Sequence, residues 1–164
     1  MSLIQLSRDE LVQRLRGGEL PLPPLAKLLN IGVEDAAPGR MVLTIEPDER
    51  HVNFLGVVGG GVVGTVLDVA MWGAVQLSVD DKSMITTVNM NTSLLRGVSH
   101  NQGRLRAVAE AVHAGRTTAV AEARLVDAHA AALPQSIPYP RRECSPARRT
   151  AGWSTRAAGR ARSR

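Results

Sequence analysis

The chain of 164 residues lacks features that several kinds of function require. It has one cysteine, Cys144, which excludes an intrachain disulfide and a cysteine-based metal site. It has one Phe, one Tyr and two Trp, too few for a surface on which nucleic-acid bases stack. The N-terminal residues lack a basic stretch followed by an apolar one, so we expect no secretion signal and a cytoplasmic location.

Acidic residues are scarce at the C-terminal end. Residues 131–164 hold eight arginines and one acid, Glu143, which gives a formal charge of +7. Because the whole chain carries +5, the first 130 residues sum to −2. This contrast predicts a folded domain over residues 1–130 and a basic tail over 131–164 that is disordered or translated from a shifted reading frame. With only Tyr139 and Trp153 as aromatic residues such a tail is usually solvated, so binding of nucleic acid is the weaker interpretation.

The spacing of apolar residues and turns predicts an α+β domain. A capping box from Ser7 to Glu10 begins a helix that ends at Gly17. Residues 59–79 are apolar nearly all round, which predicts a long helix that protein or lipid must cover. The strand candidates are residues 32–36, 40–46, 83–96, 104–113 and 117–126.

The predicted long helix carries one acid. Asp68 is the only charged residue from 52 to 79, and an acid in such apolar sequence usually has a partner or a function. A membrane span is disfavoured by six glycines between 54 and 79 and by the central acid. A buried, hydrogen-bonded structural acid remains a simpler alternative.

The same run contains a GxGxxG pattern at Gly59, Gly61 and Gly64. In a dinucleotide-binding protein this pattern follows a buried strand and belongs to a βαβ unit. Here the stretch before the pattern, residues 53–58, is too short for such a strand and is interrupted by Gly56. The strand candidates that follow come without helices between them. The match is therefore weak evidence for a dinucleotide site.

A glycine-rich helix start suits catalysis at a carbonyl group. Its free backbone N–H groups and the positive end of the helix dipole can stabilise an oxyanion, and Asn53 lies just upstream to orient water or a carbonyl. Gly60 and Asp68 are eight residues apart, which is about 12 Å along a helix. One helix therefore cannot bring both to one carbon atom, whereas two antiparallel copies across a two-fold axis can.

The order of elements resembles the hotdog fold, in which an antiparallel sheet wraps around a long central helix. Within that fold, Asn53-x-x-Gly56-x-x-Gly59-Gly60-Gly61 followed by Leu67-Asp68 resembles the acyl-CoA thioesterases of the phenylacetate-degradation (PaaI-like) type. Residues 86–91 and 95–97 resemble the strand that follows the helix. The likeness covers about residues 20 to 127.

The resemblance implies a role for each matching residue. Asp68 would be the general base or nucleophile, and the Gly60 N–H of a second copy would hold the oxyanion. Asn53 would place the water or the thioester, and Thr87 would orient water. The remaining implied substrate-binding residues are Gly59, Gly61, Arg96 and Arg116, the two arginines as candidates for the phosphates of CoA. The implied substrate is an aromatic or medium-chain acyl-CoA, and the implied assembly is a homodimer or homotetramer without a cofactor or metal.

Two departures from the family pattern suggest an alternative function. Gly59 stands where the family has histidine, so the loop that carries the Gly60 amide is more flexible. Pro134 and Pro138 follow residue 127, where the family's last strand would come, so we expect a gap in the sheet. The alternative function is a catalytically impaired hotdog domain that binds acyl-CoA or only oligomerises.

Overall fold

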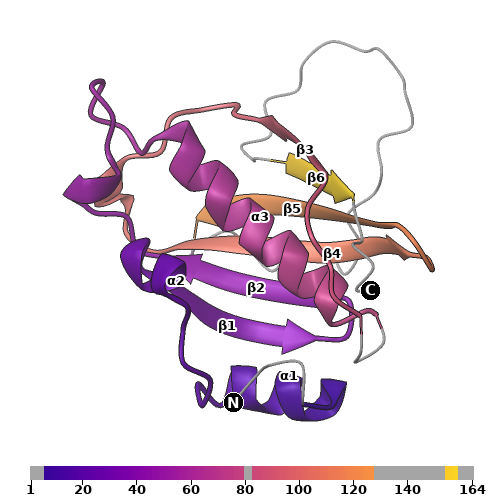
Figure 1. Cartoon of the computed structure of the whole chain (residues 1–164). Helices are drawn as coiled ribbons and strands as arrows, with labels where there is room; N and C mark the ends of the chain where they lie inside the picture. The colour runs from indigo at the N-terminus through magenta and orange to yellow at the C-terminus, as the bar shows by residue number, and fades with distance from the viewer. Residues whose placement is uncertain (1–5, 80–82, 128–153, 159–164) are drawn as a thin grey trace.

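The structure, a computed structural model, describes residues 6–79 and 83–127 and, as backbone, residues 154–158. It is an α+β domain in which one long helix, α3 (Gly60–Gln76), lies across one face of an antiparallel sheet (Figure 1). The helix predicted over residues 59–79 is thereby confirmed, and the sheet covers one side of it.

The described strands form a single sheet in the order β1-β2-β4-β5-β6-β3, and every pair of neighbours is antiparallel. Their bounds are β1 Ile31–Ala37, β2 Arg40–Ile45, β3 Asn89–Ser93, β4 Leu105–Ala114, β5 Ala119–Asp127 and β6 Ser154–Ala158. Four of the five predicted strands are confirmed within two residues at each end. The turn between β1 and β2 depends on Gly39, whose φ of 76° favours a residue without a side chain.

Short helices flank the sheet. The N-terminal helix α1 (Arg8–Arg16) lies beside β1, and α2 (Pro24–Leu28) leads into that strand (Figure 1). The capping box is present as predicted, because the Ser7 hydroxyl accepts from the Glu10 N–H and the Glu10 carboxylate accepts from the Ser7 N–H. Two 3₁₀ turns, η2 (Glu49–His51) and η3 (His100–Gln102), precede α3 and β4 respectively.

The core lies between α3 and the sheet. Leu67 and Met71 are fully buried on the inner side of the helix, and each contributes about 1.5–3 kcal/mol through removal of apolar surface from water. The alternation along β5 is confirmed, since every second residue from Ala119 to Leu125 is buried. Gly73 permits the close approach of α3 to β2, because a Cβ atom there would lie 2.6 Å from Cε of Met41.

Several sequence expectations require correction. The predicted gap in the sheet is wrong, because β6 lies between β5 and β3. Residues 154–158 contain no proline, whereas the prolines on which the prediction rested precede them. The rest of the predicted basic tail, residues 131–153 and 159–164, falls outside the described residues. The strand predicted over 83–96 is shorter, because only residues 89–93 pair with a neighbour.

The competing interpretations of the long helix are also resolved by the fold. A loop, rather than a buried strand, precedes α3, and the strand pairs are antiparallel, so the glycine pattern does not belong to a βαβ unit. Within the described residues, no helix is long and apolar enough to cross a membrane.

Candidate active site

Asp68 lies on the side of α3 that faces away from the sheet. A stripe at helical spacing runs along this side and is only partly covered; we call it the outer stripe, and it consists of Gly61, Thr65, Asp68, Trp72 and Gln76. Asp68 is therefore not a buried structural acid but a partly exposed carboxylate. This position avoids the large cost of burying a charge in apolar surroundings.

The partner of Asp68 is Thr87, the residue that the resemblance gave the role of orienting water. The Thr87 hydroxyl donates to Oδ1 of Asp68 at 2.8 Å. Thr87 is exposed and lies in the extended segment between α3 and β3. The bond fixes one carboxylate oxygen, and the other, Oδ2, has no hydrogen-bond donor among the described residues. That free oxygen is available to accept a proton from water or to attack a carbonyl carbon.

The glycine-rich start of α3 presents free amides. Gly59 is the N-cap, and its own N–H donates to the His51 carbonyl at 2.8 Å. The next two N–H groups, at Gly60 and Gly61, have no acceptor among the described residues. A helix N-terminus with unpaired amides attracts a negatively charged oxygen, which is the chemistry an oxyanion site requires.

Gly59 leaves space where a side chain would fit. Its φ of −60° and ψ of 136° suit any residue, and a Cβ atom there would be no nearer than 3.6 Å to its neighbours. Gly60 differs, because its Cβ would lie 2.6 Å from Cδ1 of Leu94. A side chain at position 60 would therefore require the exposed Leu94 side chain to move, whereas position 59 can accept one without such a shift.

Asn53 is used partly by its own loop. Its side-chain Oδ1 accepts from the Leu55 N–H at 2.9 Å, and its backbone carbonyl accepts from the Gly56 N–H. The side-chain amide group Nδ2 retains two donor hydrogens. Asn53 can therefore donate to a carbonyl or water, while its acceptor oxygen shapes the turn.

A single chain separates these groups as the sequence predicted. Gly60 and Asp68 lie on the same straight helix, two turns apart, so one carbonyl carbon cannot contact both. The helix start is flanked by exposed apolar side chains from two loops, namely Phe54, Leu55, Leu94 and Leu95. Exposed apolar residues grouped in this way are typical of a surface that another molecule covers.

His51 is a buried residue at the start of α3. It is 4% exposed, and its Nδ1 accepts from the Asp48 N–H at 2.9 Å. Through its carbonyl it also holds the N-cap of α3. Hydrogen bonds from Arg50 hold the pKa of the neighbouring Asp48 carboxyl well below its usual range. His51 therefore positions the start of the helix and does not replace the histidine that is absent at position 59.

The two candidate phosphate-binding arginines lie at opposite ends of the sheet. Arg96 donates to Asp127 at the end of β5 at 2.9 Å, whereas Arg116 lies in the turn that joins β4 to β5 at the other end. Because β5 spans nine residues of extended chain, these two ends are about 30 Å apart. The two arginines of one chain therefore cannot bind the same phosphate.

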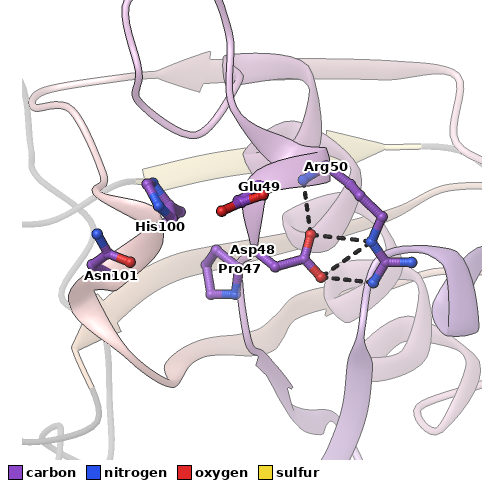
Figure 2. A pocket seen from close by; sticks show the side chains of 6 residues that line it. All are labelled: Pro47, Asp48, Glu49, Arg50, His100 and Asn101. Carbon is purple, nitrogen blue, oxygen red and sulfur yellow. Dashed lines mark hydrogen bonds and ion pairs between the residues drawn. The ribbon is translucent and has the colours of Figure 1, made fainter.

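A surface hollow occurs elsewhere in the domain. It is lined by Pro47, Asp48, Glu49, Arg50, His100 and Asn101, and the Arg50 side chain within it is paired with Asp48 (Figure 2). None of the predicted site residues lines this hollow. Among the described side chains, no group of three or more His, Cys, Asp or Glu residues is placed to hold a metal ion.

Sequence reasoning missed two members of the outer stripe that contact the segment carrying Thr87. Trp72 and Gln76 lie one and two helical turns beyond Asp68, and both donate to carbonyl groups of that segment. Their spacings of four and eight residues from Asp68 place them on the same side of a helix. This spacing could have identified them from the sequence once Asp68 was chosen.

Comparisons with known proteins agree with this fold. Residues 55–131 match the family described as the Thioesterase superfamily. No curated protein is matched. Solved structures with the same fold are matched over nearly the whole chain.

A phenylacetic acid degradation-related protein from Ralstonia eutropha is 21% identical, with a TM-score of 0.70 over 92% of this chain and 98% of that one. The PaaI protein of E. coli is 17% identical, with a TM-score of 0.68 over 92% and 93% of the two chains. Thioesterase superfamily member 2 of zebrafish is 21% identical, with a TM-score of 0.66 over 95% and 99%. The chain therefore has the hotdog fold of these structures, and its residues 55–131 are similar to the Thioesterase superfamily.

Proposed function

We propose that the protein hydrolyses acyl-CoA thioesters to a free acid and CoA. The observation that carries this proposal is the Asp68–Thr87 pair on the outer stripe, together with the unpaired amides at the start of the same helix. An oriented carboxylate and an oxyanion site are the two groups that acyl transfer to water needs. The match of residues 55–131 to the Thioesterase superfamily supports the same reaction class.

Two routes are open to Asp68. As a general base, it takes a proton from water while the water oxygen bonds to the carbonyl carbon. As a nucleophile, its Oδ2 bonds to that carbon and forms an anhydride that water then cleaves. In both routes the carbon–sulfur bond breaks, CoA leaves as a thiolate that gains a proton, and the carbonyl oxygen carries the transient negative charge.

The site requires two copies of the chain. The oxyanion would be held by the Gly60 N–H of one copy and the carbonyl carbon approached by Asp68 of the other, because one helix separates the two groups. The exposed apolar residues beside the helix start support a homodimer, or a homotetramer built from such dimers. Asn53, with its free Nδ2 hydrogens, would orient the thioester or the water.

The substrate proposed is an aromatic or medium-chain acyl-CoA. The apolar side chains around Gly60, including Phe54 and Leu94, favour an apolar acyl group. Gly59 and Gly61 have no side chain, and the space that a Cβ atom would occupy at each position is open. Substrate can therefore approach the backbone closely at these two positions. Arg96 and Arg116 are candidates for the CoA phosphates from different copies, and a cytoplasmic location would supply this substrate.

An acyl-CoA panel assay tests the proposal. Purified protein is assayed for thiol release with aromatic, medium-chain and long-chain acyl-CoAs, beside the Asp68→Asn variant. We expect turnover with an aromatic or medium-chain substrate and a loss of about 10²–10⁴-fold in kcat for Asp68→Asn, the range for removal of a general base. Retained activity in Asp68→Asn would contradict the role of Asp68.

The second candidate function is a binding or oligomerising hotdog domain without turnover. The observation that favours it is Gly59, which leaves the start of α3 without the side chain that the family carries there. Calorimetric titration with a non-hydrolysable acyl-CoA thioether separates the alternatives. Tight binding without thiol release would support this second function.

A further inference from the structure

The segment that carries Thr87 is attached along the outer stripe by a ladder of hydrogen bonds. Gln76 Nε2 donates to the Ser83 carbonyl at 3.1 Å, and Trp72 Nε1 donates to the Ile85 carbonyl at 3.3 Å. The third bond is the one between Thr87 and Asp68 at 2.8 Å. We call residues 83–87 the 83–87 segment.

The geometry of the two partners makes this ladder regular. The helix contributes every fourth residue, a rise of about 6.0 Å, and the extended segment contributes every second residue, a rise of about 6.6 Å. The two chains run in opposite directions, because Ser83 pairs with the later helix residue and Thr87 with the earlier one. Three successive bonds can therefore form without strain between a straight helix and extended backbone.

The segment belongs to no strand, so sheet pairing does not place it. Residues 83–88 precede β3, which begins at Asn89. Ile85 packs partly against the core, while Met84, Thr86 and Val88 are exposed. The position of the Thr87 hydroxyl therefore depends on the contacts that residues 83 and 85 make with α3.

We propose that Trp72 is a positioning residue that acts on the reaction through Thr87, with Gln76 in a supporting role. The Trp72 N–H fixes the Ile85 carbonyl two residues before Thr87, and thereby sets where the hydroxyl meets Asp68. This inference rests on the proposed hydrolase function, in which the orientation of the Asp68 carboxylate determines kcat. Trp72 is not thereby a catalytic residue, because it needs no contact with the substrate.

A double-mutant cycle tests the inference. Trp72→Phe keeps the ring and removes the N–H, and Thr87→Ala removes the hydroxyl. We expect Trp72→Phe to lower kcat roughly threefold to tenfold, the effect of one lost hydrogen bond, with KM changed less than twofold. In the Thr87→Ala background the same substitution should lower kcat no further, because the group through which Trp72 acts is already absent.

Two variants serve as references for the cycle. Thr87→Ser keeps the hydroxyl and should restore both kcat and its sensitivity to Trp72→Phe. Thr65→Val changes the outer stripe on the other side of Asp68, where the Thr65 hydroxyl bonds back to the Gly61 carbonyl at 2.9 Å, and should leave kcat within twofold. Equal losses in both backgrounds, or a loss in KM that depends on the acyl group, would overturn the positioning role.

A measurement without substrate separates this inference from the proposed function. A nitroxide label is attached at position 86 in the Thr86→Cys variant, with Cys144→Ser removing the other thiol, and its mobility is read by electron paramagnetic resonance. We expect Trp72→Phe to increase the mobility of the label, and Thr65→Val to leave it unchanged. If the wild-type protein shows no turnover, the proposed function fails while this result still decides the inference; unchanged mobility in Trp72→Phe would overturn it.

Discussion

The two sides of α3 have opposite tasks. The inner side, which includes Val66, Leu67, Ala70 and Met71, is fully buried against the sheet. The outer stripe holds Asp68, which is the one acid of the helix, and the hydrogen-bonding side chains of Trp72 and Gln76. The rest of the chain covers this stripe only in part. One side of the helix therefore stabilises the fold, and the other side carries the carboxylate that reacts in the proposed function. Substitutions on the two sides should separate stability from activity.

After removal of the Asp68 carboxylate, the largest effect is expected from removal of the Gly60 N–H. Proline suits the first helical position, and Gly59 already has the extended conformation that proline requires of its predecessor. Since a side chain at position 60 would collide with Leu94, the substitution is made as Gly60→Pro with Leu94→Ala. We expect kcat to fall about 10²–10³-fold, as for loss of one oxyanion donor, with the thermal midpoint little changed.

Matched variants give that result its meaning. Leu94→Ala alone controls for the removed side chain and, since Leu94 lies beside the proposed acyl site, should raise KM more than it lowers kcat. Gly61→Ala adds a Cβ atom and keeps its N–H, so its kcat should fall far less than that of Gly60→Pro, Leu94→Ala even if KM rises. A Gly60→Pro, Leu94→Ala protein with wild-type kcat would show that the Gly60 amide does not hold the oxyanion.

On the inner side we expect loss of stability without loss of chemistry. Leu67→Ala leaves a cavity next to the sheet and should lower the free energy of unfolding by about 3 kcal/mol. Urea denaturation measures the change, and kcat is assayed under conditions where the variant remains folded. A large fall in kcat in the folded variant would contradict the separation of the two sides.

A smaller effect, in this case a gain in activity, is expected from a substitution at the start of α3. Gly59→His fits the observed backbone and the open space beside it, and it reduces the flexibility of the segment that carries the Gly60 amide. If preorganisation limits the wild-type protein, kcat/KM should rise about tenfold, which corresponds to about 1.4 kcal/mol. Gly59→Ala is the control that restricts the backbone without an imidazole. No gain in a folded Gly59→His variant would show that Gly59 is not what limits activity.

The smallest effect is expected within the outer stripe itself. Thr65→Val removes a hydroxyl that only bonds back to its own helix, so the free energy of unfolding should change by less than about 0.5 kcal/mol. Chemical denaturation provides the measurement. A larger change would mean that Thr65 has a further contact, in the second copy or with substrate.

The elements of the fold with regular periodicity could be predicted from the sequence. The alternation in β5, the capping box at Ser7 and the apolar run of α3 depend on local spacing, and each is confirmed. The resemblance assigned a role to Asp68 and to Thr87 separately, but their hydrogen bond could not be predicted, because nothing local links residues 19 positions apart. The shorter β3 could not be foreseen, because residues 83–88 are held by α3 and not by the sheet.

The features that the sequence did not predict depend on tertiary contacts. The burial of His51 results from the fold around the start of α3, and no pattern in the flanking residues signals it. The strand β6 lies far along the chain from its neighbours β5 and β3, after a proline-rich stretch that suggested the sheet would end. Pairing over such a distance is decided by an available sheet position rather than by composition.

A mixed dimer tests the central claim most directly, namely that each site combines Asp68 of one copy with Gly60 of the other. Subunits with Asp68→Asn and subunits with Gly60→Pro, Leu94→Ala are co-expressed with different affinity tags, and the mixed dimer is purified through both. One of its two sites would hold an intact Asp68 and an intact Gly60, so we predict about half of the wild-type activity from two nearly inactive parents. A mixed dimer as inactive as its parents would contradict the shared site.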